Sequence, residues 1–494
     1  METKVYDVIV VGAGNAALSA ALSASEAGAS VLILEKAPKS ARGGSARFTS
    51  GGKYAYGDMK DIRALIPDLT DEEAERLDMG RYTVDDYYGD LMRISQGRAD
   101  PEMSMILAQE SYPTVKWLVD MGVKYEVHYR MSLEKNGKKH FNPRISMPTN
   151  PMGGHGGLNN QLFRIIESRP GMEVKYETKA VKLLVDGTGR VCGVGVKDAT
   201  GFHDLQARAV ILASGGFQAS LEMRVKYLGP GWDMVKVRGS RYDTGEGLEM
   251  ALDLGAAVSG QLGGCHANQV FLSGPDVEMG DEAYAHDYHL GILVNVLGKR
   301  FVDEAADYRR HTYARLGREV RVQPRSIAFQ IFDAKVTHLL DDRYQKARGV
   351  TARSLEELAN ELDIDDKSSL LATIREFNAA VQEGEFNPGI LDGKRTEGIE
   401  PAKSNWALRI DTPPFLCYPV TCGITFSLGG LKIDRNARVL DTEGNIIGGL
   451  YATGDILGTF YYNYAGGSGV SRGLVFGRIA GRTAAAERNR TASQ

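Results

Sequence analysis

The sequence predicts an α/β fold built around a Rossmann-like dinucleotide-binding unit. Val5–Val11 is a β-branched apolar run, as expected of a strand buried on both faces, and it is followed by Gly12 and Gly14. A helix of small residues then leads to a second apolar strand that ends at Glu35. The run 209–213 resembles a further buried parallel strand. At 494 residues the chain is long enough for two large units.

The first strand-to-helix turn has the chemistry of a diphosphate site. Gly12 permits a tight turn, Gly14 allows the backbone to approach a pyrophosphate, and Ala17 keeps the helix close to the strand. The helix N-terminus offers N–H groups to the phosphates, and Glu35 can hold ribose hydroxyls. An ordinary βαβ unit would not explain why two glycines stand at the strand end. A dinucleotide site is therefore expected.

Composition excludes several classes of protein. Hydrophobic content of 43% and charged content of 25% are ordinary for a globular protein. The net charge is −4 and no basic stripe occurs, so nucleic acid is not an expected partner. No apolar run reaches the roughly 20 residues of a membrane span, and the early first strand leaves no room for a signal peptide. A cytoplasmic location is expected.

The four cysteines show no metal-binding spacing, so no metal site is predicted. Cys417 and Cys422 could meet, but buried thiols are the favoured interpretation in a cytoplasmic protein.

Two glycine pairs follow Glu35. Gly43-Gly44 and Gly51-Gly52 bracket Ser45 and Arg47, a pattern that can wrap a flat ligand with backbone contacts. A flexible surface loop is the alternative. Arg47 could face phosphate, substrate or a surface carboxylate. His155 lies among four glycines and could approach the ligand or be an ordinary loop histidine.

The middle of the chain continues the α/β pattern. Residues 58–125 are expected to be mostly helical scaffold, with a further helix over 159–168. Strands are predicted over 172–185, and 186–190 has the composition of a hairpin turn. After the strand 209–213, Ser214-Gly215-Gly216 would again bring backbone next to the dinucleotide. A helix is expected over 248–254, with Asp243 or Thr244 as its N-cap, unless those N–H groups meet a ligand.

Together these segments resemble the flavoprotein subunits of fumarate reductase and succinate dehydrogenase. The resemblance rests on the glycine turn, Glu35, Gly43-Gly44-Ser45, 213–216, 243–247, 292–304 and 449–455. It implies FAD as the cofactor and a Rossmann-like FAD-binding domain that is interrupted by a fumarate-reductase-type capping domain. The resulting α/β fold carries an α+β cap.

Within that superfamily the chain most resembles FAD-dependent tricarballylate dehydrogenases, through 301–309, 403–407, 420–426 and 463–469. The FAD is expected to be non-covalent, because the histidine that carries covalent flavin in membrane relatives is absent from residues 42–45. The implied domains are 1–262 and 404–494 for FAD and 263–403 for the cap. The cap is expected to carry helices over 336–340 and 369–383.

The glycine segments and the resemblance together give a set of expected FAD contacts. These are Gly12, Gly14, Asn15, Ala16, Glu35, Lys36, Gly43, Gly44, Ser45, Gly51, Gly52, Ala180, Val181, Ala213, Ser214, Gly215, Asp243, Gly454, Asp455, Ser468, Gly469 and Val470.

The residues that act on fumarate in the resembled family are mostly replaced. His266 matches the first substrate histidine. The acid arginine should lie just before Ile292, where this chain has His286-Asp287-Tyr288-His289. The second histidine falls near Phe426 and the second arginine falls on Tyr464. Three of the four positions depart, which argues against fumarate reduction.

The replacements suggest desaturation. Tyr464 and Gly467 precede a helix whose N-terminus could stabilise a reduced flavin, an arrangement similar to that of 3-ketosteroid dehydrogenases. Tyr464 and Tyr288 are candidate bases, although both could simply pack with satisfied hydroxyls. His266 is the third candidate catalytic residue.

A carboxylate substrate would need cations and a shaped pocket. The candidates for substrate binding are His289, Arg309, Phe426 and Gly467, with Arg310 also available. Arg309 and Arg310 could instead pair with Asp303, Glu304 or Asp307.

The expected function is an FAD-dependent dehydrogenase acting on CH–CH groups, which introduces an α,β C=C bond into a small carboxylate such as tricarballylate. The alternatives are a 3-ketosteroid or cyclic-ketone desaturase, a flavin electron-transfer subunit of a redox complex, and a corrin-biosynthesis flavoprotein. No second dinucleotide fingerprint occurs, so the expected partner is an external electron acceptor or an iron–sulfur or membrane redox protein.

Overall fold

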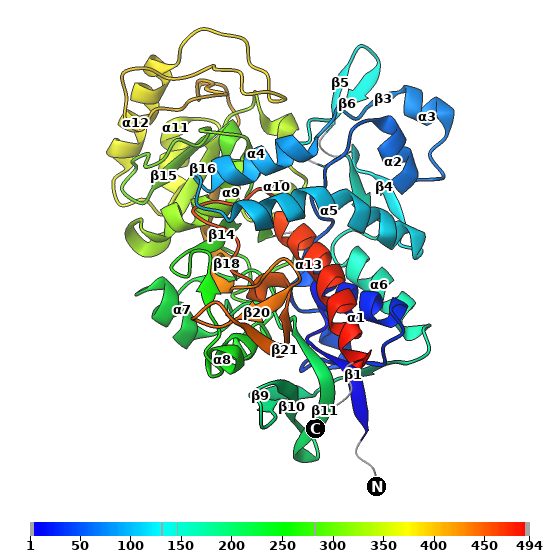
Figure 1. Cartoon of the computed structure of the whole chain (residues 1–494). Coiled ribbons are helices and arrows are strands. Elements are labelled where there is room, and N and C mark those ends of the chain that lie inside the picture. The colour runs from blue at the N-terminus through cyan, green and yellow to red at the C-terminus, as the bar shows by residue number, and fades with distance from the viewer. Residues whose placement is uncertain (1–3, 130–131, 146, 281–282, 490–494) are drawn as a thin grey trace. The chain divides into compact units, whose positions relative to one another are not determined.

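The computed structural model (Figure 1) describes residues 4–129, 132–145, 147–280 and 283–489. These residues fall into two units. The described residues within Met1–Asp233, Gly239–Cys265 and Phe426–Gln494 form the first unit, and those within Met234–Arg238 and His266–Thr425 form the second. Each unit is described by itself below.

The first unit is built on an eight-stranded sheet whose main path runs β20-β21-β11-β1-β2-β8, with β10 and β9 extending from β11. Its strands are β1 (Val5–Val11), β2 (Val31–Leu34), β8 (Met172–Lys175), β9 (Lys179–Val185), β10 (Val191–Asp198), β11 (Gly201–Leu212), β20 (Arg438–Leu440) and β21 (Ile446–Ala452). The predicted α/β class and the strands β1, β2 and β11 are confirmed.

The parallel register brings three strand ends to one edge. Val11 lies opposite Leu34 on β2 and opposite Leu212 on β11. Backbone bonds continue this pairing, from Gly12 N–H to the Leu34 carbonyl (2.8 Å) and from Ala213 N–H to the Val11 carbonyl (2.9 Å). Gly12, Glu35 and Ala213 therefore lie together at the carboxyl edge, where open α/β sheets bind ligands.

The predicted hairpin is also confirmed. β9 and β10 pair antiparallel across residues 186–190, and β10 continues antiparallel onto β11. Asp186 accepts backbone bonds from Thr188 (2.8 Å) and Arg190 (3.1 Å), which closes the turn. This hairpin extends the sheet away from β1.

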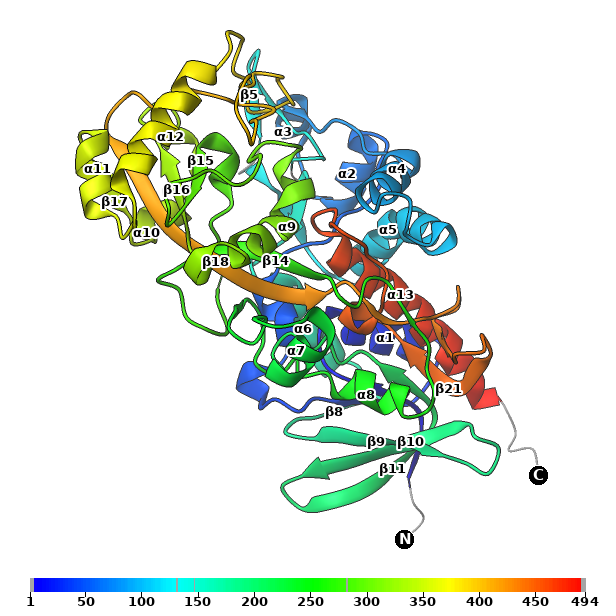
Figure 2. The same cartoon turned by 90° about the vertical axis from the view of Figure 1, so that its left-hand side faces the viewer.

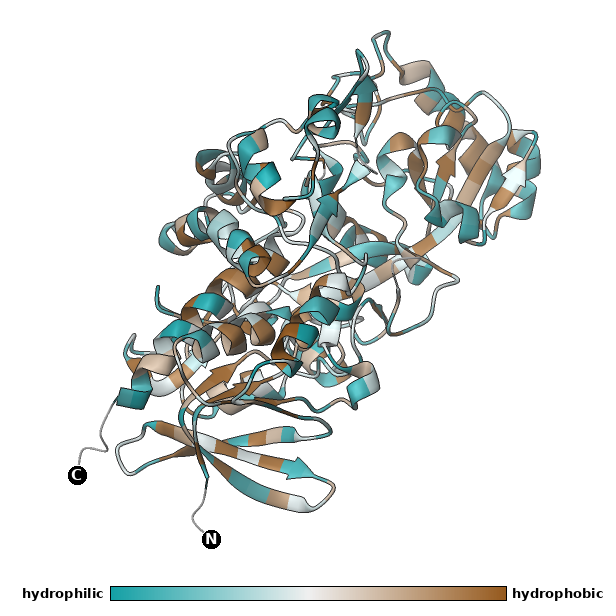
Figure 3. Ribbon diagram, turned by 90° about the vertical axis from the view of Figure 1, so that its right-hand side faces the viewer, coloured by the Kyte–Doolittle hydropathy of each residue, from teal (hydrophilic) through white to brown (hydrophobic). Residues whose placement is uncertain are grey.

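Two helices far apart in the sequence pack together against the sheet. α1 (Asn15–Glu26) and α13 (Ser468–Ala485) lie side by side, blue and red in Figure 1. A Cβ at Gly477 would stand 2.6 Å from the Ala16 carbonyl oxygen, so only glycine allows this approach. The Ser19 and Ser23 hydroxyls donate to carbonyls of α13 at 2.8 and 2.7 Å. Most residues of α1 and α13 and of the strands β1 and β2 are buried, and Figure 3 shows much of the ribbon in this region of the first unit in brown, as apolar.

The remainder of the first unit is helical scaffold with short strand pairs. The predicted helical region contains α2 (Met59–Leu65), α3 (Asp71–Glu75), α4 (Val84–Ile94) and α5 (Pro101–Asp120), and the other helices are α6 (Gly157–Glu167), α7 (Leu221–Leu228) and α8 (Glu246–Leu252). The short strands are β3 (Leu77–Asp78), β4 (Tyr125–Val127), β5 (Leu133–Lys135), β6 (Lys138–His140), β7 (Thr149–Pro151), β13 (Val258–Ser259) and β19 (Gly430–Leu431).

The prediction that Asp243 or Thr244 is the N-cap of α8 is wrong. The N-cap is Gly245, whose φ of 88° is in the left-handed region, and no side chain caps the helix. Asp243 and Thr244 are directed elsewhere, because Asp243 accepts from Ser45 and Gln218 while Thr244 contacts Lys36 and Glu246. The helix also begins two residues earlier than expected.

The second unit is organised around the 13-residue strand β18 (Phe415–Ser427), the long orange strand in Figure 2. A six-stranded sheet has the path β12-β18-β16-β15, and β14 and β17 also pair with β18. Its other strands are β12 (Lys236–Val237), β14 (Cys265–Phe271), β15 (Ile292–Asn295), β16 (Ala328–Phe332) and β17 (Val350–Ala352). Its helices are α9 (Arg309–Arg321), α10 (Arg343–Lys346), α11 (Leu355–Glu361) and α12 (Lys367–Ala380).

The prediction of a helix over residues 336–340 in this unit is wrong. Residues 336–340 form only a 3₁₀ turn over Thr337–Leu339, after which Leu340 is extended. Val336 is instead anchored in an apolar cluster with Phe332 and Leu290, and a single turn of this kind does not propagate. The other expected helix is present as α12, and its N-cap is Asp366.

Cys265, Cys417 and Cys422 are buried thiols. Among the described residues, no helix combines the length and apolar character that crossing a bilayer requires.

Candidate functional site

The strand ends of the first unit form a cradle lined by backbone. A side chain at Gly12, which has a φ of 108°, would collide with the Ala213 carbonyl. A Cβ at Gly14 would stand 3.6 Å from the Gly43 carbonyl oxygen. Gly14 is the N-cap of α1 and has no side chain, so no N-cap side chain occupies the first N–H groups of the helix. We refer to residues 12–14, 43–45 and 214–216, with Glu35 and Asp243, as the cradle.

Glu35 lies where the ribose acid was expected. Its side chain is buried and accepts from Ala37 N–H (2.9 Å) and Gly43 N–H (3.4 Å). Burial raises its pKa, although these backbone bonds oppose the shift. The carboxyl is thus held at the end of β2 by the same loop that carries the first glycine pair.

Lys36 belongs to an ion cluster beside the cradle. Its ammonium contacts Thr244 Oγ1 (2.5 Å) and Glu246 Oε2 (2.8 Å), and Lys179 contacts Glu246 Oε1 (2.8 Å). Burial raises the pKa of Glu246, but the two lysines outweigh it and lower the pKa to about 2. Glu246 is therefore ionised near neutral pH.

Asp243 lies inside the cradle. Its Oδ2 accepts from Ser45 Oγ (2.5 Å) and from Gln218 Nε2 (2.7 Å). Burial raises the pKa of Asp243 to about 7, against the effect of the Ser45 hydrogen bond, and the charge of Asp455 adds to the rise. This carboxyl joins the loop 43–45 to the segment that opens α8.

Two orphaned polar atoms fit a dinucleotide in this cradle. Asn15 Nδ2 and Ser214 Oγ are buried and have no hydrogen-bond partner among the described residues. Buried polar groups normally find partners, so these atoms favour a polar ligand. With helix N–H groups for phosphate and Glu35 for a ribose, the donor set suits FAD.

The remaining expected FAD contacts occupy several elements. Ala180 and Val181 lie on β9, Gly454 and Asp455 open a 3₁₀ turn, and Val470 lies in the first turn of α13. Gly52 packs against α13, where a Cβ would stand 2.7 Å from Ser471 Oγ. The sequence did not decide what Arg47 and His155 contact. In the structure Arg47 donates to the Ala41 carbonyl (3.4 Å), and the exposed His155 contacts the Phe48 carbonyl (3.0 Å).

Tyr464 is buried at the N-terminus of α13. Its hydroxyl oxygen accepts from Gly467 N–H and Gly469 N–H, both at 2.9 Å, so these groups meet a protein partner in this structure. Phe426 and Phe460 pack edge-on against its ring, with centroids at 5.3 and 5.4 Å. Burial raises the phenol pKa, so the phenol is protonated at neutral pH.

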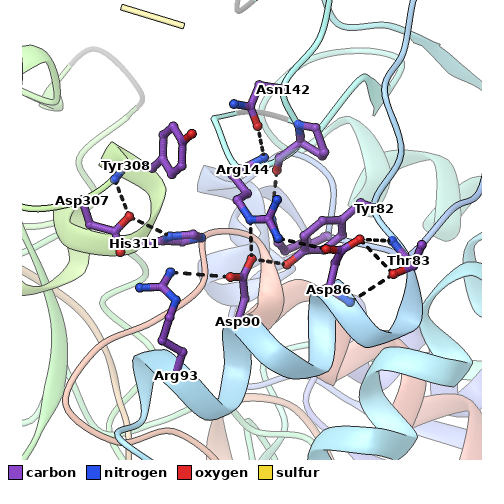
Figure 4. Close-up of polar contacts among 12 residues, drawn as sticks. Tyr82, Thr83, Asp86, Asp90, Arg93, Asn142, Arg144, Asp307, Tyr308 and His311 are labelled. Carbon is purple, nitrogen blue, oxygen red and sulfur yellow. Dashed lines mark hydrogen bonds and ion pairs between the residues drawn. The ribbon is translucent and has the colours of Figure 1, made fainter. Parts of the chain in front are cut away.

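A polar cluster at α4, which includes residues outside that helix, was not predicted from the sequence (Figure 4). Tyr82 donates to Asp90 Oδ2 (2.8 Å), and Arg144 forms ion pairs with Asp90 (3.4 Å) and Asp86 (3.0 Å). Thr83 and Asp86 form a reciprocal capping box at the start of α4. The sequence Thr-x-x-Asp carries the cap signal, but no local pattern points to Arg144.

Figure 4 also draws a cluster of the second unit, in which Asp307 Oδ1 accepts from Tyr308 N–H (2.7 Å) and lies 3.4 Å from His311 Nδ1. It belongs to the start of α9.

In the second unit, His266 lies on β14 and is buried. Burial, followed by the charge of Arg238, holds its pKa well below the usual value, so its imidazole is neutral. The pKa of His289 is also lowered, by burial and then by the charge of Arg309. Both expected histidines are thus neutral near pH 7.

Tyr288 and Arg309 have partners within the second unit. Tyr288 packs in an apolar cluster, its hydroxyl lies 2.8 Å from Thr312 Oγ1, and burial raises its pKa. Arg309 NH1 pairs with Asp287 Oδ1 at 3.0 Å, an acid that sequence reasoning did not consider as its partner. Glu304, one of the partners considered, instead pairs with Arg300 (2.6 Å).

Sequence reasoning also missed a cluster around Tyr284. The Arg238 guanidinium lies 4.4 Å from the Tyr284 ring centroid, and that of Arg343 lies 5.3 Å away. His286 stacks on the same ring at 4.6 Å, and its pKa is lowered by burial and then by Arg343, Arg309 and Arg238. These residues are up to about a hundred positions apart, so no local pattern could join them.

The cradle and the sheet together define a flavoprotein of the α/β class. A family model described as "FAD binding domain" matches residues 7–471. The chain belongs to this FAD-binding family, within the fumarate reductase and succinate dehydrogenase flavoprotein superfamily. It is an FAD-dependent oxidoreductase.

Similar proteins were found over almost the whole chain. A fumarate reductase (cytochrome) of Shewanella frigidimarina is 29% identical over 494 residues, covering 97% of this chain and 77% of that protein. A urocanate reductase of Eggerthella lenta is 28% identical over 500 residues, covering 97% and 74%. The structure of a 3-ketosteroid Δ1-dehydrogenase from Sterolibacterium denitrificans matches 98% of this chain and 100% of its own, with a TM-score of 0.74 and 22% identity. The last match concerns the fold.

Proposed function

We propose that this FAD-dependent oxidoreductase introduces an α,β C=C bond into a small carboxylate, by tricarballylate-type dehydrogenation. The main observation in favour of a carboxylate substrate is that arginine charges surround His266 and His286. Arginine charges lower the pKa of both imidazoles in addition to the effect of burial. A region that disfavours a further positive charge favours an anion.

The relatives support this substrate class. Fumarate and urocanate, which appear in the names of two similar proteins, are both unsaturated carboxylates. The chain keeps His266 but has no arginine in the segment 286–291, and Tyr464 stands where the second arginine was expected. These replacements favour dehydrogenation over fumarate reduction.

The chemistry divides between cofactor and chain. Bound FAD supplies the acceptor for the hydride that leaves the β-carbon. The chain must supply a base for the α-proton and cations that hold the carboxylate. His266, as a neutral imidazole, is our proposed base, while protonated Tyr464 is suited to donating a hydrogen bond. His289, Arg309, Phe426 and Gly467 are retained as proposed substrate contacts.

The cofactor is proposed to be non-covalent and the physiological electron acceptor to be external. The cytochrome in the name of one relative supports a separate redox partner. We further propose a cytoplasmic location, and the capping role for residues 263–403.

A ketone desaturase is the second candidate. The surroundings of Tyr464 favour it, because Phe426 and Phe460 make that site aromatic and Tyr464 could polarise a carbonyl. A flavin electron-transfer subunit has no comparable observation in its favour.

Anaerobic bleaching of the bound flavin separates these functions. Purified protein is mixed with tricarballylate, succinate or a saturated 3-ketosteroid, and absorbance near the visible flavin maximum is followed. Bleaching by tricarballylate without bleaching by the steroid is expected. Bleaching by the steroid alone would reject the carboxylate proposal in favour of the second candidate.

A further inference from the structure

Asp243 is a buried acid that the proposed chemistry does not use. Among the described residues, both hydrogen bonds to its carboxyl group go to Oδ2, from Ser45 Oγ at 2.5 Å and from Gln218 Nε2 at 2.7 Å. Its other oxygen, Oδ1, faces glycine backbone. A Cβ at Gly215 would stand 2.6 Å from Oδ1, and one at Gly44 would stand 3.4 Å from it. The carboxyl is therefore wedged between two glycine segments.

Those glycines belong to the part of the cradle suited to the diphosphate. Gly12 packs against Ala213, directly before Ser214 and Gly215, and Gly14 approaches the carbonyl of Gly43. Helix α1 also begins here, directly after its N-cap Gly14. Phosphates are expected at such a helix N-terminus. Asp243 is thus a potential anion placed among the groups that attract another anion.

The neighbouring charges do not neutralise Asp243. Asp455 and Glu35 act on it as negative charges, and Lys36 is the positive charge that opposes them. Lys36 itself pairs with Glu246 at 2.8 Å. The remaining contacts, from Ser45 and Gln218, are neutral hydrogen bonds. Burial is the main reason that the pKa of this carboxyl is raised to about 7.

We propose that binding of FAD is coupled to protonation of Asp243, so that the protein takes up one proton from solvent as the dinucleotide binds. The FAD diphosphate brings negative charge toward the cradle, which disfavours a second carboxylate there. The protonated acid is uncharged, and its O–H can donate a hydrogen bond to a phosphate oxygen. No electron transfer or covalent step is involved.

The sign of the pH dependence follows from this coupling. Below about pH 6 Asp243 is already protonated in the FAD-free chain, so binding takes up little proton. Above pH 7 it is ionised before binding and protonated afterwards. FAD affinity therefore falls as pH rises, by up to about tenfold per pH unit between the free and bound pKa values.

Calorimetry measures the proton directly. FAD is titrated into the full-length chain after flavin removal, at pH 8, in two buffers with different ionisation enthalpies. The wild-type protein is expected to take up about one proton per FAD bound, and Asp243→Asn is expected to take up none. Asp253→Asn, which changes an exposed acid at the C-cap of α8, is the matched control and should behave as wild type.

Retention of flavin by the holoenzyme gives a second measurement. After desalting at pH 6.5 and pH 8.5, wild type should lose more FAD at the higher pH, while Asp243→Asn should retain the same fraction at both. Equal proton uptake by wild type and Asp243→Asn, or no uptake by wild type, would overturn the proposal.

A further variant covers the case in which Asp243→Asn does not fold. Ser45→Ala removes a hydrogen bond that lowers the Asp243 pKa, so the pH dependence should move to higher pH. An unmoved dependence in this variant would also overturn the proposal. The inference rests on FAD as the cofactor and is independent of which substrate is oxidised.

Discussion

The Tyr464 hydroxyl accepts the backbone N–H of Gly469 at 2.9 Å, and that of Gly467 at the same distance. A side chain thus occupies N–H groups that the sequence suggested for flavin or substrate. The contact makes Tyr464 both a helix cap and a candidate hydrogen-bond donor to substrate.

Tyr464→Phe should separate these roles. Loss of a catalytic hydrogen bond or proton transfer is expected to lower turnover by about a hundredfold or more with FAD retained. Loss of the cap alone would destabilise the fold by about 1–3 kcal/mol and leave turnover nearly unchanged. Turnover of tricarballylate and the flavin-to-protein ratio are measured together. Tyr112→Phe, which removes a hydroxyl bonded to the Asp61 carbonyl, is the control.

His266→Ala tests the proposed base and carboxylate contact. We expect kcat/KM for the carboxylate to fall by about a hundredfold or more with FAD content unchanged, since the proposed general base is lost. Because its pKa is held well below 6.5, His266 should contribute no limb to the pH–rate profile between pH 7 and 8. The control is His338→Ala, at an exposed position. Equal losses in both variants would remove His266 from the mechanism.

Tyr288→Phe examines a candidate base that the structure places in an apolar cluster. Its hydroxyl contacts Thr312 and its pKa is raised, so we expect a stability loss of about 1 kcal/mol and turnover within about twofold of wild type. Abolished turnover with an intact melting transition would contradict this expectation and restore Tyr288 as the base.

Arg472→Met should strongly destabilise the first unit. Arg472 is fully buried on α13, pairs with Asp455 at 2.5 Å and donates to the Leu457 carbonyl at 3.0 Å. Removing one partner of a buried pair costs about 3–5 kcal/mol. The midpoint of chemical unfolding reports this cost. Arg482→Met, at an exposed position of the same helix, should unfold near the wild-type midpoint.

Asp243 should also make the stability of the FAD-free chain depend on pH. Its folded pKa, about 7, lies above the value of an unfolded aspartate, so the folded state binds more proton and stability falls as pH rises from about 4 to 7. Asp243→Asn removes this contribution. The flavin-free variant should therefore gain melting temperature relative to wild type at pH 8, measured by calorimetry, and gain less at pH 5. An equal gain at both values would argue against ionisation of Asp243.

The elements that depend on local pattern were predictable. Val5–Val11, Gly12 and Glu35 follow from strand burial, turn chemistry and spacing within about 30 residues, and the structure confirms that arrangement. The hairpin at 186–190 was predictable for the same reason. Such features need no knowledge of distant contacts.

The errors arose where distant residues decide the local structure. Asp243 does not cap α8 because Ser45, about 200 positions earlier, takes its carboxylate. Val336 does not extend a helix and instead lies in an apolar cluster with Leu290 and Tyr418, which come from distant parts of the sequence. The groups around Tyr284 and Tyr82 come from separate elements, and a single sequence carries no signal that brings them together.

The pairing of α1 with α13 has a consequence for synthesis of the chain. Ser19 donates to a carbonyl of α13 that lies 455 residues later, so the face of α1 that packs against α13 stays uncovered until α13 has left the ribosome. The nascent polypeptide can form β1 and β2 early, but α1, at whose N-terminus the phosphates are expected, stays uncovered on that side. Flavin capture by the growing chain should therefore wait until α13 has been synthesised.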